Sequence, residues 1–389
     1  ERKKEKKNPP LLFNLAELQN TCSKLFKISP DETLKIVQEL YEKKLVTYPR
    51  TDARVLSSAV AKEIHKNIQG LKNFPLVQGI PDYILEGKRY AGLSKTRYVN
   101  DKQITDHYAI IPTGQGFGAL RSVSSTAAKV YEVIVRRFLC IFYPPAEYMK
   151  LALTVEKGGE SFFAGFKVMT EAGYLSIANA SFSKKRTEDI PSENSDEEEK
   201  EVSGQKGSSI IEAFKKLKKG TEISMTEMTV KEGETSPPKR YNSGSIVLAM
   251  ENAGQLIDDE ELRAQIKGSG IGTSATRAEI LSKLIHNKYL NLNKKTQIIT
   301  PELLGEMIYD VVSISMKSLL NPKLTASWEL GLTQVEEGKI SEDEYMEKLD
   351  AFIHKRVDSV KQTNYNQMLQ RMFAQDAAYY KTGIRKKKA

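Results

Sequence analysis

The chain has 389 residues, and its 59 lysines and arginines against 50 aspartates and glutamates give a net charge of +9 and a pI near 9.1. This length predicts roughly two to four domains, and the positive charge favours a polyanionic partner without excluding others. Arg136 and Arg137 interrupt the longest apolar run, which excludes a membrane span, so we expect a soluble, cytoplasmic protein with no membrane contacts.

The two ends of the chain are both basic. The first seven residues, ERKKEKK, begin at Glu1 rather than Met and have neither the apolar segment nor the cleavage site of a signal peptide. We therefore interpret the chain as a piece of a longer protein. The basic residues 384–388 are predicted to be a solvated tail.

Helical spacing of apolar residues marks the next part of the chain. A first helix is predicted to follow Asn14 as its N-cap, and a second to start at a capping box at Ser29 with Pro30 as its first residue. A short extended piece at 45–48 stops at Pro49, and a third helix begins at Ser57. This order is typical of a helix-turn-helix unit, although it also occurs in other α-rich folds.

The middle of the chain is predicted to change from helix to strand. Residues 104–113 are expected to form a strand and residues 126–142 a long helix. Alternating apolar residues at 150–155 and 162–168 indicate antiparallel strands, so that 146–240 forms a β-rich segment. Within it, the polar and acidic stretch 184–207 is predicted to be a disordered loop.

Helical spacing returns after the two prolines at 237–238. One helix is predicted at 245–252, and a second is predicted to be capped by Thr273. Two short extended runs, at 289–292 and 297–300, follow this second helix and are joined by a basic tip. A helix followed by such a hairpin is similar to a winged helix.

The segment LVTYPRTD at 45–52 is the first candidate for chemistry. Pro49 disfavours a helix at Tyr48, and residues two apart in an extended segment face the same way, so Tyr48 and Arg50 are expected to converge. A cation beside a phenol favours the phenolate and can hold the phosphate that it attacks. The alternative is a buried tyrosine at the end of a strand with an exposed arginine beside it.

Three further groups of residues are candidates for binding or proton transfer. His107, beside Asp106, can donate to a phosphate oxygen or shuttle a proton, unless it is a structural imidazole.

The glycine-rich segment before Thr273, Thr276 and Arg277 predicts an anion site at a helix start, but no Lys follows its last glycine as a P-loop requires. Residues 237–241 add Lys239, Arg240 and Tyr241, which can contact a nucleic acid strand or form an exposed linker.

The cysteines and the acidic runs of the sequence are not arranged as metal ligands. Cys22 and Cys140 are too far apart in sequence for a C-x-x-C zinc site and are expected to be buried thiols in a reducing compartment. The acidic runs 258–261 and 342–344 are expected to be solvated faces of helices. The sequence therefore predicts no metal site within this chain.

Five blocks of sequence together resemble the type IA DNA topoisomerases, of the bacterial topoisomerase III kind. The blocks are LVTYPRTD, TDHYAIIPTG at 105–114, PPKRYNSGSIVLAMENAG at 237–254, GSGIGTSATRAEIL at 268–281 and SWELGLTQVEEGKIS at 327–341. They occur in the order and at the separations of the family, and the similarity extends over residues 9–360.

The resemblance implies roles for the candidate residues. Tyr48 would be the nucleophile that forms a 5′-phosphotyrosyl bond with one DNA strand, and Arg50 and His107 would position and stabilise the scissile phosphate. Thr273, Thr276 and Arg277 would hold the backbone of the single strand. Because the covalent bond conserves the energy of the broken phosphodiester, resealing would need no ATP.

The resemblance also implies an α+β, multidomain fold and a missing part. We expect a helix-turn-helix-like tyrosine domain at 14–143, which residues 1–13 enter from an antiparallel β-rich arch at 144–240. A winged-helix-like domain at 241–360 and a C-terminal helix with the basic tail at 361–389 follow. No counterpart of the family's N-terminal toprim domain, whose acidic cluster binds Mg²⁺, is recognised, and no zinc ribbon follows.

We therefore predict a core fragment of a monomeric type IA topoisomerase that acts on single-stranded or negatively supercoiled DNA. The intact enzyme would relax or decatenate DNA with Mg²⁺ and without ATP or zinc. The fragment alone is expected to bind single strands weakly and with little or no turnover. The alternative is a catalytically inert single-strand-binding fragment, and other tyrosine-based DNA breakers fit the histidine spacing and the tyrosine position less well.

Overall fold

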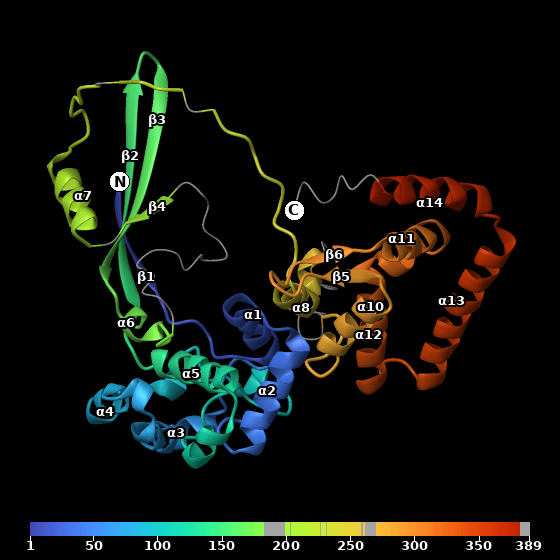
Figure 1. Ribbon diagram of the computed structural model, residues 1–389, viewed down its shortest axis with the longest axis horizontal. Helices are drawn as coiled ribbons and strands as arrows, with labels where there is room; N and C mark the ends of the chain where they lie inside the picture. Colours follow the sequence, from blue (N-terminus) through green and yellow to red (C-terminus); the bar gives the residue numbers. More distant parts are fainter. Residues whose placement is uncertain are drawn as a thin grey trace. The chain divides into compact units, whose positions relative to one another are not determined.

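The computed structural model describes residues 1–182, 199–202, 204–225, 227–230, 232–257, 260 and 270–381. The chain divides into two compact units, coloured by sequence in Figure 1. The first unit comprises residues 1–14 and 36–237, and the second comprises residues 15–35 and 238–389. The expectation of a multidomain chain that mixes helices and strands is confirmed.

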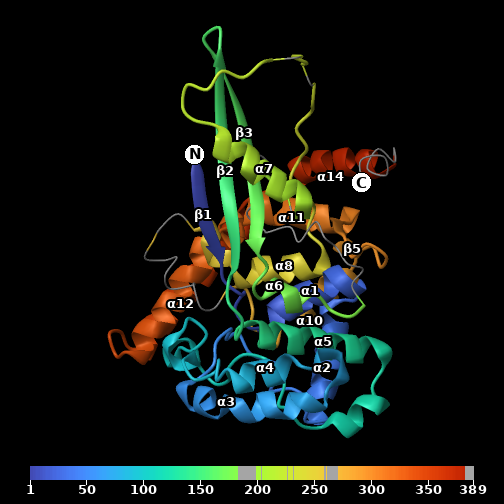
Figure 2. The ribbon, with the colours of Figure 1, turned by 90° about the vertical axis from the view of Figure 1, so that its left-hand side faces the viewer.

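The helical part of the first unit contains two of the predicted helices and part of a third. The boundary between the units falls within α2 (Pro30–Glu42), and α3 (Ser58–Gly70), α4 (Ile80–Glu86) and α5 (Ser125–Cys140) follow. Ser57 and Ser124 cap α3 and α5, because their hydroxyls accept from backbone N–H groups of the first turn. Figures 1 and 2 both show α5 lying across α3 and α4. Short 3₁₀ helices fill the connections, at Leu71–Asn73, Pro75–Val77, Leu93–Lys95, Asp101–Gln103 and Phe117–Ser122.

The predicted strand at 104–113 does not form. This segment instead makes isolated bridges, in which Ile110 pairs with Phe13 and Pro112 with Val46. Its partners come from separate parts of the chain, and none runs beside it far enough to complete a ladder. The second half of the segment nevertheless lies in the interior, because Ala109, Ile110 and Ile111 are buried.

A four-stranded sheet forms the other main part of the first unit as described. Its strand order is β1 (Arg2–Lys7), β2 (Ala146–Lys157), β3 (Glu160–Glu171) and β4 (Glu199–Val202), and a short helix, α6 (Leu175–Ala178), follows β3. The two predicted antiparallel strands are confirmed as β2 and β3, the long hairpin of Figure 2. Strand β4, which was not predicted, pairs parallel to β3. The basic N-terminal segment is an edge strand, antiparallel to β2.

The end of the predicted disordered loop is also ordered. Residues 183–198 lie outside the described residues, but 199–202 form β4 and α7 begins at once (Gly204–Lys216). The polar residues at the start of α7 obscure the apolar face of this helix in the sequence pattern. On that face Phe214 packs against Leu151 and Val168 of the hairpin. Arg2 of β1 donates to the carbonyls of Phe214 and Leu217 at the end of the helix.

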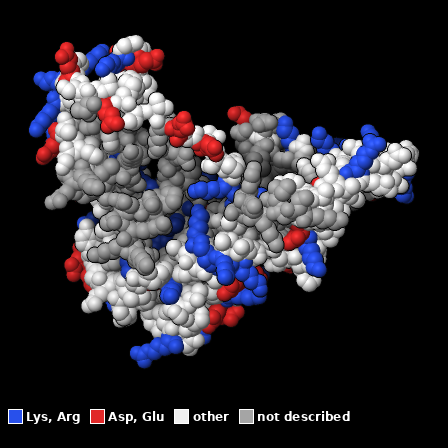
Figure 3. Space-filling view, turned by 45° about the horizontal axis from the view of Figure 1, so that its top comes forward, with Lys and Arg blue, Asp and Glu red and all other residues white. Residues whose placement is uncertain are grey.

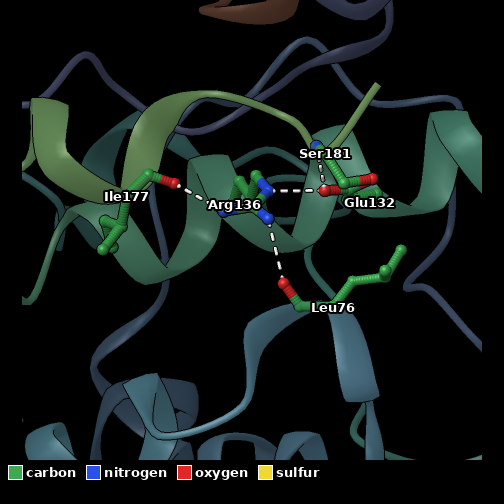
Figure 4. Close-up of polar contacts among 5 residues, drawn as sticks. All are labelled: Leu76, Glu132, Arg136, Ile177 and Ser181. Carbon is green, nitrogen blue, oxygen red and sulfur yellow. Dashed lines mark hydrogen bonds and ion pairs between the residues drawn. The ribbon is translucent and has the colours of Figure 1, made fainter. Parts of the chain in front are cut away.

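A buried ion pair connects α5 with α6 and with neighbouring turns (Figure 4). Glu132 is 1% exposed, and its carboxylate accepts from Arg136 Nε at 2.6 Å. The backbone N–H and hydroxyl of Ser181 each donate to the same carboxylate at 2.7 Å. Arg136 also donates to the carbonyls of Ile177 and Leu76, so both charges have hydrogen-bond partners.

The second unit is mainly helical and contains the predicted helix and hairpin. Ala16, Val247, Leu281 and Ile299 form a buried cluster at its centre. The hairpin is antiparallel, as predicted. In chain order the unit contains α1 (Leu15–Phe26), α8 (Ser243–Glu251), α10 (Arg277–His286), β5 (Leu290–Leu292), β6 (Ile299–Pro301), α11 (Leu303–Ser315), α12 (Pro322–Glu336), α13 (Glu342–Gln362) and α14 (Asn366–Lys381), with 3₁₀ turns at Ala253–Leu256 and Lys317–Leu320.

Helix α1 belongs to the second unit, which corrects the expected domain at 14–143. The Ser23 and Ser243 hydroxyls lie 3.1 Å apart, and Gln297 donates to the Lys27 carbonyl at 3.0 Å. A Cβ on Gly244 would lie 2.5 Å from the Cα of Asn20, so α8 approaches the α1 backbone closely. The spacing of apolar residues predicts that α1 is a helix, whereas these long-range contacts decide to which unit α1 belongs.

Several smaller expectations also have an outcome. Both cysteines are free and buried, as predicted, and burial raises the pKa of each thiol to about 12. Residues 342–344 are exposed in the first turn of α13, as expected for a solvated face. The acidic run 258–261, apart from Glu260, and the basic tail 384–388 lie outside the described residues. None of the helices described is long and apolar enough to cross a bilayer.

Candidate active site

Backbone hydrogen bonds fix the segment that carries Tyr48. The Thr113 N–H donates to the Leu45 carbonyl and the Thr47 N–H to the Ile111 carbonyl, each at 3.0 Å. Val46, between them, pairs with Pro112. The predicted extended piece at 45–48 is thus present as a short antiparallel contact with the segment that carries His107.

Tyr48 and His107 lie ring against ring. Their centroids are 4.3 Å apart with an interplanar angle of 43°. Tyr41 of α2 packs edge-on against Tyr48, with centroids 5.4 Å apart. Tyr48 is half-buried and His107 is exposed, so the phenol is not enclosed in an apolar interior. The structure therefore brings together two residues that are 59 positions apart in sequence (107 minus 48).

Arg50 is exposed, and it follows Tyr48 in a turn rather than in a regular strand. The Thr51 N–H donates to the Pro49 carbonyl at 3.0 Å, which turns the chain immediately after Tyr48. Within the described part of the chain, Arg50 has no ion pair, and its guanidinium is open to solvent. The segment is thus not a regular strand at Arg50, and the convergence of Arg50 and Tyr48 stays a prediction.

The surroundings of the pair combine both signs of charge. Arg50, Asp52 and Asp106 are all exposed near the two rings in sequence. Figure 3 shows basic side chains at many points of the face drawn there, with acidic side chains between them. An exposed imidazole beside a half-buried phenol can meet a phosphate from solution.

The glycine-rich segment of the second unit differs from its prediction. Helix α10 begins at Arg277, and Thr273 lies in the preceding turn rather than at the cap. The Thr273 carbonyl accepts the N–H groups of Thr276 and Arg277, while its own N–H donates to Thr276 Oγ1 at 2.9 Å. Two hydroxyls are therefore exposed before the helix, but they bond to their own turn.

Arg277 is not a surface cation. Its side chain is 2% exposed, and its Nε donates to the Ile271 carbonyl at 3.2 Å. The guanidinium therefore supports the glycine-rich turn from inside the unit, and its part in an anion site stays a prediction. Lys239 and Arg240, in contrast, are exposed in a segment without regular structure.

No metal site is found in the part of the chain that is described. It contains no group of three or more His, Cys, Asp and Glu side chains arranged to hold a metal ion. Asp52 and Asp106 thus do not belong to such a group.

Two threonines beside Tyr48 were missed by the sequence reasoning. Thr47 Oγ1 donates to the Ala109 carbonyl at 3.0 Å and accepts from the Ile111 N–H at 3.0 Å. Thr51 Oγ1 donates to the His107 carbonyl at 2.8 Å. Their only signal in the sequence is their position on either side of Tyr48 and Pro49, which indicates no partner.

Comparison with known families identifies the class of this protein. The sequence model of a family described as DNA topoisomerase matches residues 1–347. The chain therefore belongs to the DNA topoisomerase family, and its resemblance to the type IA, topoisomerase III kind is confirmed.

Individual relatives agree with this assignment. The chain is 33% identical to DNA topoisomerase 3 of Bacillus licheniformis and of Bacillus subtilis over 359 residues, which is 91% of this chain and 45% of each relative. It thus spans about half the length of the curated relatives it matches. Full-length topoisomerase I of Thermotoga maritima has a similar fold, with a TM-score of 0.55 at 20% identity, over 92% of this chain and 51% of that structure.

Proposed function

We propose that this chain is the tyrosine-bearing part of a type IA DNA topoisomerase and that Tyr48 is its nucleophile. The observation that carries the proposal is the Tyr48 ring beside the His107 ring, with centroids 4.3 Å apart, in a chain of this family. The intact enzyme would pass one DNA strand through a transient break in another, and so relax or decatenate single-stranded or negatively supercoiled DNA.

The proposed reaction is a reversible phosphoryl transfer. The Tyr48 Oη attacks the scissile phosphorus, a new P–Oη bond forms, and the bond from phosphorus to the 3′-oxygen breaks. The phenolic proton is lost to a base or to water, and the leaving 3′-oxygen takes up a proton as it becomes a hydroxyl. Resealing runs the same steps in reverse, so no ATP is consumed.

Arg50 and His107 are proposed to act on the phosphate. The guanidinium of Arg50 would pair with the non-bridging oxygens, and the imidazole of His107 would donate to one of them or carry the proton. Both side chains are exposed, which leaves room for a strand beside Tyr48.

Strand binding by the second unit is also a proposal. The exposed hydroxyls of Thr273 and Thr276 and the exposed cations of Lys239 and Arg240 have the chemistry that contacts a sugar-phosphate backbone. Arg277 would contribute from inside the unit by supporting the glycine-rich turn.

Mg²⁺ is expected for the intact enzyme but does not fit the residues described in this chain. We propose that its ligands lie in a part of the enzyme that this chain does not include. None of the steps above passes through the metal, and no zinc is required.

Replacing Tyr48 with Phe tests the proposal. With the half of the relatives that this chain does not span supplied in trans, we expect the native chain to form a covalent adduct with a single-stranded oligonucleotide. The Tyr48→Phe variant should bind the same oligonucleotide but form no adduct, because only the attacking oxygen is lost. Adduct formation by the variant would refute the assignment of Tyr48.

The alternative of an inert single-strand-binding fragment has a distinct outcome in the same experiment. Binding by both proteins, with an adduct from neither even when the remaining half is present, would favour that alternative. Tyr41→Phe is the matched control, because Tyr41 touches the Tyr48 ring and its variant should still form the adduct.

A further inference from the structure

The backbone ladder beside Tyr48 lacks a bond at Pro49. Backbone bonds join 45 to 113 and 47 to 111, so the next bonded pair of a regular antiparallel ladder would join 49 to 109. Pro49 has no N–H to donate to the Ala109 carbonyl. A buried carbonyl left without a donor is costly, and Ala109 is 0% exposed.

Two threonine hydroxyls replace the missing ladder. Thr47 Oγ1 donates to the Ala109 carbonyl and accepts from the Ile111 N–H, both at 3.0 Å. Thr51, which is 4% exposed, donates to the His107 carbonyl at 2.8 Å and accepts from the Ala53 N–H at 3.0 Å. One hydroxyl precedes Tyr48 and the other follows it, and both bond to the segment that carries His107.

We propose that Thr47 and Thr51 are positioning residues that hold Tyr48 against His107. Proline interrupts the backbone pairing between the segment of Tyr48 and the segment of His107, and the two hydroxyls hold these segments together at that point. Tyr48 therefore stays beside His107 although the regular backbone pairing has ended. That this geometry serves phosphoryl transfer rests on the proposed function, whereas the geometry itself can be measured without any activity.

The first test uses the native chain. The Ile111 and Ala53 amides donate to the two hydroxyls and are expected to exchange slowly with deuterium. Exchange of either amide at the rate of an unprotected loop would overturn the proposal for the hydroxyl concerned.

The second test measures the contact between the two rings by NMR. The native chain should give cross-peaks between the Tyr48 and His107 ring protons. We expect these to disappear in the Thr47→Val, Thr51→Val double variant, which keeps the shape of both side chains, and to return in the Thr47→Ser, Thr51→Ser variant, which restores the hydroxyls. Unchanged cross-peaks in a folded valine variant would overturn the proposal.

Thr96→Val is the matched control. Thr96 Oγ1 likewise donates to a carbonyl, that of Leu93 at 2.7 Å, and accepts from the amide two residues on, that of Tyr98 at 3.3 Å. Loss of this hydroxyl should leave the ring cross-peaks unchanged, and their loss in this control would contradict a specific role for Thr47 and Thr51.

In the complete enzyme, adduct formation by the valine double variant should be about 100-fold slower, as expected when a reacting group is displaced by about 1 Å. The serine variant should recover most of the rate. An unchanged rate would contradict the positioning role. Absence of any adduct from the native enzyme would instead count against the proposed function, and the exchange and NMR results would still decide the geometry.

Discussion

Glu132 and Arg136 form a buried pair in which each charge depends on the other. The carboxylate is 1% exposed and the Arg136 side chain 12% exposed. The pair joins α5 to the 3₁₀ turn of Leu76, to Ile177 of α6 and to Ser181 just after α6 (Figure 4). Removing one member of a buried pair leaves an uncompensated charge in the interior.

We therefore predict that Glu132→Ala lowers the free energy of unfolding of the first unit by about 3–5 kcal/mol. Urea denaturation followed by circular dichroism measures this change. Glu63→Ala is the control, because Glu63 pairs with Lys66 on the surface and its loss should leave the midpoint unchanged. Equal effects of the two substitutions would contradict the account of the buried pair.

Individual site residues were predictable from the sequence to different degrees. Sequence motifs contain Tyr48, Arg50 and His107 and indicated the chemistry of these side chains. The motifs did not indicate the distances between them. The burial of Arg277 could not be predicted, because a glycine-rich helix start is equally consistent with a cation in front of it or beneath it. The roles of Thr47 and Thr51 depend on carbonyls about 60 residues away, at Ala109 and His107, for which local pattern gives no signal.

At the scale of elements, α1 and α8 pack through a position without a side chain. A Cβ on Gly244 would lie 2.5 Å from the Asn20 Cα and 2.9 Å from the Ser23 Cβ. Alanine favours a helix over glycine by about 1 kcal/mol, so an isolated α8 would gain from Gly244→Ala. In the folded unit the methyl group has no space.

We predict that Gly244→Ala destabilises the second unit by about 1–3 kcal/mol, the usual cost of forcing extra volume into a packed interface. Thermal denaturation measures the effect. Gly118→Ala serves as the control, because a Cβ there meets nothing within 4 Å. Stabilisation by Gly244→Ala would show that helix propensity outweighs packing and that the close approach is not required.

The helices were more predictable from the sequence than the packing and pairing contacts that the elements make with one another. The capping residues at Ser29 and Ser57 and the spacing of apolar residues are local signals of a helix, and the hairpin of β5 and β6 was also expected. The parallel pairing of β4, the ordered start of α7 and the placement of α1 all depend on contacts over long sequence separations. Tertiary packing decides these features, which is why sequence pattern alone did not.

At the scale of the whole molecule, each unit contains one buried thiol. Burial raises the pKa of Cys22 in the second unit and of Cys140 in the first to about 12, from an ordinary value of 9.0. Above pH 9 the unfolded chain loses these protons while the folded chain keeps them. The unfolded state is then favoured, so stability falls as the pH rises.

We expect each thiol to contribute a loss of about 1.4 kcal/mol per pH unit between pH 9 and the raised pKa. Urea midpoints between pH 8 and pH 11 measure the slope, with Cys22→Ala and Cys140→Ala as comparisons in which the slope should be smaller. The same slope with and without the thiols would contradict this prediction.

The central claim is that the Tyr48 oxygen becomes joined to DNA, and direct mapping of the covalent bond tests it. The adduct formed by the chain together with the remaining half of the enzyme would be trapped on an oligonucleotide, digested with protease, and its nucleotide-bearing peptide sequenced by mass spectrometry. We predict a 5′-phosphate on Tyr48. A nucleotide on any other residue, or a 3′-phosphate linkage, would contradict it.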